Sequence, residues 1–499
     1  MEPKPVVRFV VPVATLLTAF GLRFAALGRL PLLPDEAYYW LWSRHLDWAY
    51  YDHPAGVALL LRLSTTLGGH SEFGIRWLNA LLGTASVALT IVVGRQMSAQ
   101  SAGLLAGVTV AVGAPFLITA RFVYTDALFV FLMLLNLTSF LALVGMEPGT
   151  GAAEKKLAAR VGFGVTLALL LNTKYTAYLY AAGLAGWLLW ERRRLLRERW
   201  FWQAVIIAAA GLLPVFVWNA AHDWVSFRWQ LAHAVSVSPG ASVQPYLGWQ
   251  WAANVGHAVT YHTWPLAIAA VVGAVGLIRQ RSAPAARLVG WLAVMLGLPM
   301  LLSPASSPRN LTAGLLFLLL GAGIWGNALH QRGRQLVMLA TTLLLGLTAA
   351  YGAGTVSALS CGTGPFHSSV TSEIRRDVAG LQDLIAVAAY HPQGAIVAVD
   401  YSLAGQLWYY TGRRVATGWG QYQLWELPAL DDVTVLSLDY LPAPLIDAQL
   451  RRAFMVVEGP QHVFSAERAF TWWRARGLRW ERAELLARLD FLDLWEASR

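Results

Sequence analysis

Residues 125–145 read TDALFVFLMLLNLTSFLALVG, an almost uninterrupted apolar run with a single acidic residue near its start. A helix needs about 20 mainly apolar residues to cross the hydrocarbon core of a bilayer. Comparable runs recur from the N-terminus to about residue 355. The pattern therefore predicts a membrane protein with many spanning helices.

The composition agrees with this prediction. Hydrophobic residues make up 57% of the 499 residues and charged residues only 13%, against about 25% charged in an average soluble domain. The net charge of +10 lies in basic clusters between the apolar runs, as membrane orientation requires, so we expect no nucleic-acid partner. The lone Cys361 excludes an intrachain disulfide and a cysteine-based metal site.

A window reading of the apolar runs predicts about eleven transmembrane helices. The first span is expected from about Phe9 to Leu30, and the later ones lie near 73–94, 101–120, 125–145, 158–172, 175–190, 202–219, 254–278, 286–303, 309–329 and 335–355. The basic clusters all fall on one side if Asn172-Thr173-Lys174 separates two short spans. The positive-inside rule then puts the N-terminus in the cytoplasm.

The remaining segments are expected outside the cytoplasm. They are an interfacial first loop at 31–72, a loop near 220–252, and a small soluble α/β domain at 356–499, which follows the transmembrane domain at 1–355. In the soluble domain we predict strands at Ala395 to Val399 and Val433 to Leu438, and a helix from Ser465 to Arg476.

The first loop carries the strongest candidate for acid–base chemistry. Pro34 can open a helix whose first turn holds Asp35 and Glu36, where the helix dipole favours negative charge. A carboxylate fixed at a membrane surface can act as a general base toward a hydroxyl. The alternative is that Asp35 only caps the helix.

Three other external turns bring ionisable residues to the same surface. Arg121 and Asp126 flank one turn, and either they pair with each other or Asp126 orients the base, a substrate hydroxyl or a basic residue. Lys174 and Tyr175 occupy a second turn, where a lysine opposes the positive-inside bias; it either snorkels to head groups or binds a carrier phosphate. Arg309 adds a third cation for the same anion.

A metal site is a weaker hypothesis. Asp52, His222 and His262 are the candidate ligands, but their spacing matches no compact ligand motif. We therefore expect no cofactor requirement, and a divalent metal is not expected to be essential. The sequence also has no phosphate-binding glycine loop, which argues against an ATP-driven pump.

Several of these motifs together resemble the bacterial glycosyltransferase 39 family, which contains protein O-mannosyltransferases and the aminoarabinose transferase of lipid A. They are Asp35-Glu36-Ala37-Tyr38-Tyr39-Trp40, Tyr50-Tyr51-Asp52-His53-Pro54, the turns at Arg121 to Asp126 and Lys174-Tyr175, and the stretch from Trp218 to Phe227. The sequence departs from the family pattern at Pro54-Ala55, where two prolines are common, and at Ser307-Pro308-Arg309-Asn310.

The resemblance implies a GT-C fold and a glycosyltransferase of the bacterial inner membrane, with a polyprenyl-phosphate sugar as donor and a periplasmic active site. We expect the transfer to proceed with inversion. The resemblance assigns catalysis to Asp35 and Asp126. The residues it implies for binding substrate or lipid phosphate are Glu36, Arg44, His53, Arg121, Lys174, Tyr175 and Arg309. The acceptor stays open among lipid A or lipopolysaccharide, another envelope glycan, and a secreted protein.

Two other classes of protein fit the sequence less well. A polyprenyl-lipid flippase or transporter would also have many spans and ionisable groups, but transporters tend to carry interrupted helices in paired halves, and no such pairing is visible. A non-catalytic scaffold or receptor does not explain why acids and bases gather in several short external turns.

Overall fold

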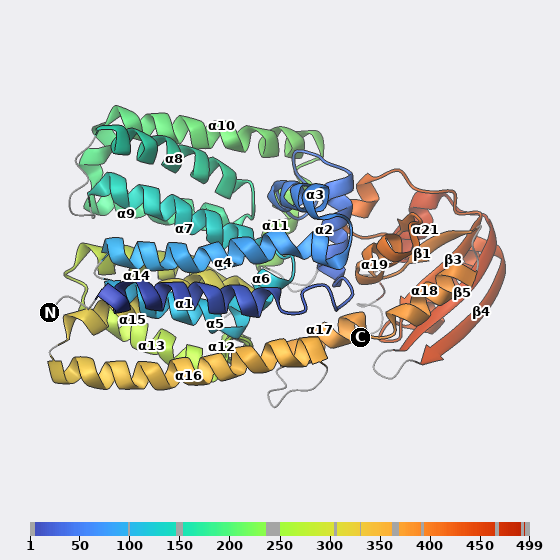
Figure 1. The fold of residues 1–499 in the computed structure, drawn as a ribbon. Helices are drawn as coiled ribbons and strands as arrows, with labels where there is room; N and C mark the ends of the chain where they lie inside the picture. The colour runs from blue at the N-terminus through green and yellow to red at the C-terminus, as the bar shows by residue number, and fades with distance from the viewer. Residues whose placement is uncertain are drawn as a thin grey trace. The chain divides into compact units, whose positions relative to one another are not determined.

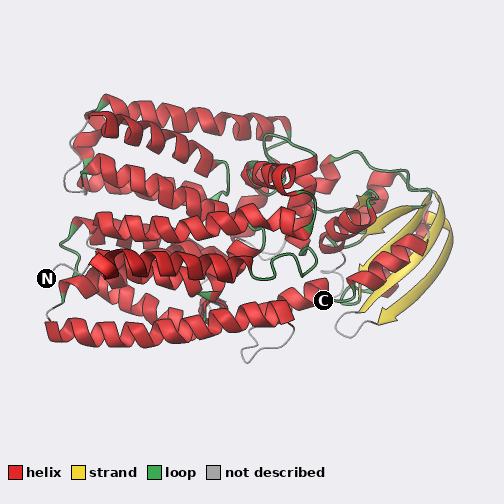
Figure 2. Cartoon of the chain, in the orientation of Figure 1, coloured by secondary structure: helices red, strands yellow, loops and turns green. Residues whose placement is uncertain are grey.

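The computed structural model describes residues 5–97, 100–145, 153–235, 250–303, 307–329, 331–361, 369–390, 394–464, 469–490 and 494. The chain divides into two compact units. The first comprises Met1–Arg29, Asp47–Ala49 and His53–Thr371, and the second comprises Leu30–Leu46, Tyr50–Asp52 and Ser372–Arg499. Helices make up the described part of the first unit, and the strands lie in the second (Figures 1 and 2).

The first unit is a bundle of long helices. In chain order they are α1 (Pro5–Phe24), α3 (Gly56–Gly68), α4 (Glu72–Met97), α5 (Gln100–Val112), α6 (Ala114–Arg121), α7 (Thr125–Val144), α8 (Ala153–Leu171), α9 (Thr176–Glu191), η1 (Arg193–Arg197), α10 (Arg199–Ala221), α11 (Val225–Val235), α12 (Gln250–His262), α13 (Trp264–Arg279), α14 (Pro284–Leu302), η2 (Pro308–Leu311), α15 (Thr312–Ala328) and α16 (Gln331–Cys361).

Helix α7 lies inside the bundle and packs against α4, α6, α8 and α9. Many of its apolar side chains are buried, and Leu137 and Phe140 are fully so. Gly145 ends the helix in a left-handed conformation with φ of 72°, which favours a residue without Cβ. Asp126 lies in its first turn, as the sequence predicts.

Two expected spans are bent. The run at 101–120 forms α5 and α6 with an angle of 61° between them, and the run at 254–278 forms α12 and α13 with an angle of 111°. Pro115 and Pro265 occupy the first turns of α6 and α13, where proline fits a helix start but would break a helix interior. The sequence predicted each run as one span and did not predict the bend within it.

Five helices of the described residues are long and apolar enough to cross a membrane, or up to seven if each bent pair counts as one span. The expected number of about eleven is not confirmed. The first helix is shorter than expected, since it ends at Phe24 and Ala26 has a positive φ of 53°. The loop near 220–252 contains a helix, α11, in its described part.

The second unit is a small α/β assembly. Its helices are α2 (Pro34–Arg44), α17 (Ser369–Val378, whose first residues belong to the first unit), α18 (Leu381–Tyr390), α19 (Tyr401–Thr411), η3 (Gly420–Leu424), α20 (Ala443–Ala453) and α21 (Arg482–Arg488). Its strands are β1 (Ala395–Ala398), β2 (Val415–Ala416), β3 (Asp432–Leu438), β4 (Phe454–Phe464) and β5 (Ala469–Leu478). The sheet order is β2-β1-β3-β5-β4. Strands β2, β1 and β3 are parallel to one another, and β5 pairs antiparallel with both β3 and β4.

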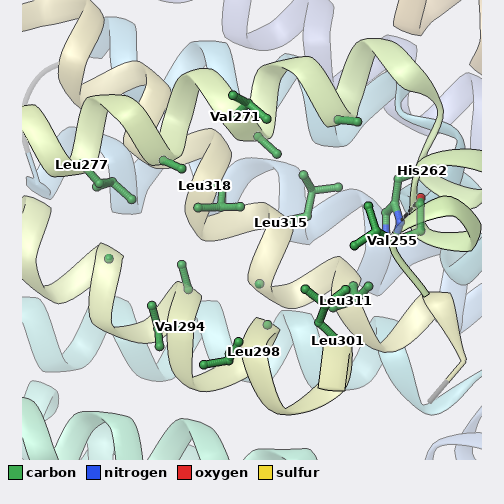
Figure 3. A pocket seen from close by; sticks show the side chains of 18 of the residues that line it. Val255, His262, Val271, Leu277, Val294, Leu298, Leu301, Leu311, Leu315 and Leu318 are labelled. Carbon is green, nitrogen blue, oxygen red and sulfur yellow. Dashed lines mark hydrogen bonds between the residues drawn. The ribbon is translucent and has the colours of Figure 1, made fainter. Parts of the chain in front are cut away.

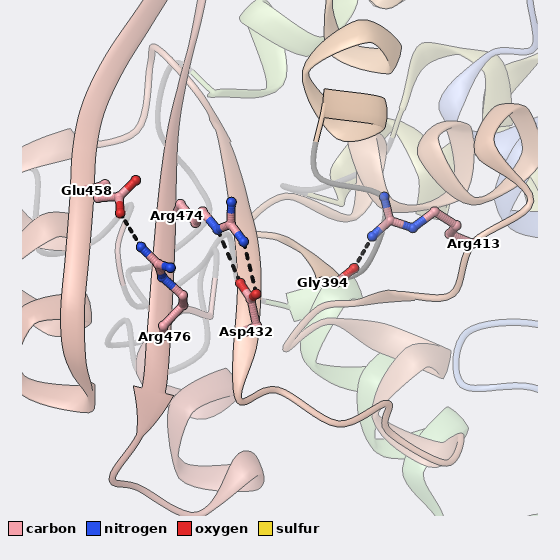
Figure 4. Close-up of polar contacts among 6 residues, drawn as sticks. All are labelled: Gly394, Arg413, Asp432, Glu458, Arg474 and Arg476. Atoms are coloured by element: carbon pink, nitrogen blue, oxygen red, sulfur yellow. Dashed lines mark hydrogen bonds and ion pairs between the residues drawn. The ribbon is translucent and has the colours of Figure 1, made fainter.

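Strands β1 and β3 were predicted almost to their ends, but the predicted helix from Ser465 to Arg476 is wrong. The described part of that segment is strand β5, in which Thr471, Trp473 and Ala475 are buried while the residues between them are more exposed. This alternation is the pattern of a strand. On the more exposed face Arg474 pairs with Asp432 of β3 at 3.0 Å, and Arg476 pairs with Glu458 of β4 (Figure 4).

The first-loop helix α2 begins at Pro34, which confirms the predicted helix start. It packs against α19 of the same unit, and the ring of Tyr38 stacks on Tyr422 with centroids 5.3 Å apart. Gly405 of α19 permits this approach, because a Cβ there would lie 2.9 Å from the backbone nitrogen of Tyr38. The sequence did not predict that this loop helix shares a core with residues more than 350 positions away.

Candidate active site

A buried polar cluster in the first unit joins three segments. The ammonium group of Lys174, in the turn between α8 and α9, donates to Oδ1 of Asp126 at 2.8 Å and to Oδ1 of Asn310 at 2.7 Å. Lys174 is 7% exposed and Asp126 is 5% exposed. Within the described residues, Oδ2 of Asp126 is buried and accepts no hydrogen bond. The structure thus brings two of the predicted site residues together.

The third predicted cation lies beside this cluster. Arg309, in η2, places its guanidinium 4.4 Å from the ring centroid of Tyr124. Tyr124 directly precedes α7, and Arg309 precedes Asn310. Asn310 is the member of the cluster that sequence reasoning did not assign, although it stands in the quoted turn beside Arg309. The cluster therefore contains one cation and one carboxylate, and a second cation, Arg309, precedes its member Asn310 in the chain.

An apolar groove of about 560 Å³ runs between α12, α13, α14 and α15 (Figure 3). Val271, Leu277, Val294 and Leu318 are among its walls, and His262 lies at one end. Leu311 also lines the groove, and it directly follows Asn310 of the polar cluster. The groove and the cluster therefore meet at η2, which suits an amphipathic ligand.

His262 closes the end of the groove with both of its ring nitrogens engaged. Nδ1 lies 3.0 Å from the carbonyl of Ala258, and Nε2 lies 3.2 Å from the hydroxyl of Thr312. A carbonyl can only accept, so Nδ1 carries the proton and the Thr312 hydroxyl donates to Nε2 of the neutral ring. His262 thereby ties the end of α12 to the start of α15.

The other predicted metal ligands do not form a metal site in the part of the chain that the structure describes. Nδ1 of His222 donates to the carbonyl of Trp218 at 2.8 Å, and the two rings stack at 4.0 Å. Among the described residues there is no group of three or more His, Cys, Asp or Glu side chains that could hold a metal ion.

Arg121 and Asp126 do not pair with each other. Asp126 pairs with Lys174, whereas the guanidinium of Arg121 donates to the carbonyls of Leu22 and Arg23 at 2.7 and 3.2 Å. Arg121 is only 3% exposed. Its position closes the C-terminal end of α1, so the structure gives no support for the predicted contact with substrate.

In the second unit, the two acids of α2 have different surroundings. Glu36 is fully buried, and its Oε2 accepts from the backbone nitrogen of Leu33 at 2.9 Å. It therefore acts as a cap for the first turn of α2. Asp35 is half-buried beside it, and its negative charge acts on Asp52.

Asp52 is the acid–base candidate that sequence reasoning missed, because it considered this residue only as a metal ligand. Burial, followed by the charge of Asp35, raises the pKa of Asp52 to about 7. The Tyr38 hydroxyl lies 3.5 Å from Oδ1 of Asp52 and accepts from the backbone nitrogen of Gln421 at 2.8 Å. Two neighbouring carboxyl groups, one of which titrates near neutrality, form a pattern typical of acid–base sites.

Three predicted residues remain, Arg44, His53 and Tyr175. Arg44 is exposed at the end of α2 in the second unit, and His53 is half-buried in the first unit. Tyr175 follows Lys174, and its ring contacts Tyr178 and Phe227 edge-on at 5.6 and 5.5 Å. Tyr175 thus packs beside the polar cluster on aromatic neighbours.

Comparison with known proteins agrees with the helical architecture and the motifs. Residues 52–218 match the family model of dolichyl-phosphate-mannose-protein mannosyltransferases. The lipid A galacturonosyltransferase RgtD of Rhizobium johnstonii is 30% identical over 195 residues, which are 39% of this chain. The matched segment spans 40% of that relative's length.

Solved structures with the same fold cover almost the whole chain. The ArnT protein of Cupriavidus metallidurans superimposes with a TM-score of 0.64 at 15% identity over 93% of this chain and 97% of its own; it has also been solved bound to undecaprenyl phosphate. The oligosaccharyltransferase of Archaeoglobus fulgidus gives a TM-score of 0.53 at 13% identity over 83% of this chain and 64% of its own.

The fold is therefore that of the GT-C class of membrane proteins. The sequence matches, each over part of the chain, fit the GT-C glycosyltransferase family that the first-loop motif predicts.

Proposed function

We propose that this protein transfers a sugar from a polyprenyl-phosphate carrier to a hydroxyl group of an envelope acceptor. The observation that carries the proposal is the meeting of the apolar groove with the polar cluster at Leu311 and Asn310. A polyprenyl phosphate has the same two parts, an apolar chain and an anionic end. The sequence match to a lipid A galacturonosyltransferase favours lipid A or lipopolysaccharide as the acceptor.

In this proposal the prenyl chain lies in the groove and the carrier phosphate faces Lys174 and Arg309. Lys174 is already balanced by Asp126 at 2.8 Å, so Arg309 supplies the excess positive charge of the cluster. Asp126 orients the ammonium group of Lys174. Cations positioned at the phosphate stabilise the charge that develops there as the sugar departs.

The proposed reaction is a single displacement with inversion. The acceptor oxygen forms a bond to the anomeric carbon, the bond from that carbon to the phosphate oxygen breaks, and the electron pair leaves with the carrier phosphate. Asp35, the half-buried acid of α2, accepts the hydroxyl proton as general base. No step needs a nucleotide, a covalent enzyme intermediate or a metal. The expected location is the bacterial inner membrane, with the N-terminus in the cytoplasm and the reaction on the periplasmic side.

The test is mass spectrometry of envelope lipids, glycans and secreted proteins from a deletion strain complemented with wild type, Asp35→Asn or Asp47→Asn. Asp47 is an exposed acid that belongs neither to the polar cluster nor to the pair of Asp35 and Asp52, and it serves as the control. One glycosylated species should vanish in the deletion and return with wild type and Asp47→Asn, but not with Asp35→Asn. If Asp35→Asn restores that species fully, Asp35 is not the base; if no species changes, the transferase function fails.

A further inference from the structure

The turn between α6 and α7, which precedes Asp126, receives hydrogen bonds from an asparagine of another helix. The side-chain amide of Asn79, on α4, donates to the carbonyls of Thr119, Ala120 and Phe122 at 3.1, 2.9 and 2.9 Å. Asn79 is 1% exposed. The last carbonyls of a helix have no partner within the helix, so Asn79 closes the end of α6 and fixes the turn that leads into α7.

Arg121, the last residue of α6, closes a second helix end in the same way. Its guanidinium donates to the carbonyls of Leu22 and Arg23, near the end of α1. Arg23 in turn closes a third end, since it donates to Val110 and Ala111 of α5 at 2.9 Å each. The C-terminal ends of α1, α5 and α6 are thus each closed by a side chain from a different helix.

Neither arginine has a carboxylate partner among the described residues, although Arg23 is fully buried and Arg121 nearly so. A buried guanidinium is costly unless negative potential surrounds it. The partial negative charges of the helix C-termini supply that potential. Gly83 permits this packing of α4 on α6, because a Cβ there would lie 2.3 Å from the Cβ of Ala120.

We propose that Asn79, Arg23 and Arg121 are positioning residues that hold the α6–α7 turn, and with it Asp126 and Tyr124, at the polar cluster. The inference rests on the proposed function for its catalytic consequence, but the support itself is a property of the fold. It also assigns Arg121 a role different from the substrate contact that the sequence predicts. Because Asp126 follows the turn by only a few residues, loss of the support should move its carboxylate relative to Lys174.

The test compares two isosteric substitutions of buried asparagines in detergent-purified full-length protein. Asn79→Asp keeps the shape of the side chain and replaces the donating amide by an acceptor that faces three carbonyls. Asn136→Asp is the matched control, because Asn136 is fully buried on α7 and donates to the carbonyl of Phe163 and the hydroxyl of Thr166, away from the turn. Hydrogen exchange of the peptide at 119–127 is measured with kcat and KM for the lipid-linked donor.

Asn79→Asp should speed exchange in the 119–127 peptide and lower kcat by about 10- to 100-fold with KM within about twofold, the size expected when a reacting group is displaced by about 1 Å. Asn136→Asp should speed exchange near 163–166 and leave kcat close to wild type. Arg121→Lys, which keeps one donor, should regain part of the kcat lost in Arg121→Met.

Three results would overturn the inference: no change in exchange at 119–127, faster exchange there with unchanged kcat, or an equal loss of kcat in Asn136→Asp. If wild type itself transfers no sugar, the proposed function fails instead. Exchange at 119–127 in Asn79→Asp still decides whether the support exists.

Discussion

The carboxyl group of Asp52, in the second unit, responds to pH near neutrality. Its pKa rises from 3.8 to about 7 on folding, first through burial and then through Asp35. Between these two pH values the folded state binds more protons than the unfolded state, so its stability falls as pH rises. Deprotonation near pH 7 also adds a negative charge beside Asp35.

Asp52→Asn should remove this pH dependence. The amide cannot ionise, so the melting temperature of the variant relative to that of wild type should be higher at about pH 8 than at about pH 5. Thermal unfolding at the two pH values measures the difference. An unchanged difference between the variant and wild type across this range would show that Asp52 does not titrate there.

Substitutions in the ion pair between Lys174 and Asp126 can separate its contribution to protein stability from its contribution to sugar transfer. Breaking a buried pair by removing one partner costs about 3 to 5 kcal/mol, because the other charge is left buried alone. Asp126→Asn and Lys174→Gln should therefore each destabilise the protein, and the double variant should regain most of that loss. Transfer should stay absent in all three, since the carrier phosphate loses its cation or its orienting acid. An active double variant would reduce the pair to a structural role.

At the scale of elements, the groove between α12 and α15 contains a glycine at which an added Cβ would enter open space. Gly297 of α14 lines the groove, and a Cβ at this position meets nothing within 4 Å. Gly346 of α16 has equally open surroundings but does not line the groove. The two glycines therefore form a matched pair.

Gly297→Leu should raise the apparent KM for a long-chain donor by about tenfold, the effect of losing about 60 Å² of apolar contact at about 25 cal/mol per Å². A donor with a short prenyl chain should be used almost as well as by wild type, and Gly346→Leu should alter neither KM. Steady-state kinetics with the two donors checks this. Equal KM changes in both glycine variants would contradict a chain in the groove.

The bent helices show which local sequence signals a hydropathy window misses. Pro115 and Pro265 each mark a helix start, and the sequence contained that signal. Average hydropathy over a window hid it, because both halves of each bent pair are apolar. The error at β5 has another origin: Arg474 and Arg476 suit a helix surface, but their partners Asp432 and Glu458 lie on neighbouring strands.

At the scale of the whole molecule, the remaining prediction concerns orientation. The basic run at η1 should face the cytoplasm and the second unit should face the periplasm. With Cys361→Ser as background, Glu426→Cys should react with a membrane-impermeant maleimide in intact spheroplasts. Arg194→Cys should react only after permeabilisation. Both positions are exposed, Glu426 by 89% of its side chain. The reverse labelling pattern would invert the topology.

The sequence by itself determined the membrane class, the helical character of the described part of residues 1–355, two strands of the C-terminal sheet and the start of α2 at Pro34. These features follow from local quantities: apolar runs, alternation and the fixed φ of proline. It also drew attention to Asp35, Asp126, Lys174 and Arg309 by their position in turns.

Only the tertiary structure decided which of these residues meet. It paired Lys174 with Asp126 and Asn310, turned Arg121 toward α1 and used Glu36 as a cap. Side-chain partners come from segments that are distant in sequence, such as α7 and η2, and helix packing sets their separation. A linear pattern records which charges must be neutralised within an apolar bundle, but the three-dimensional packing selects the partner of each one.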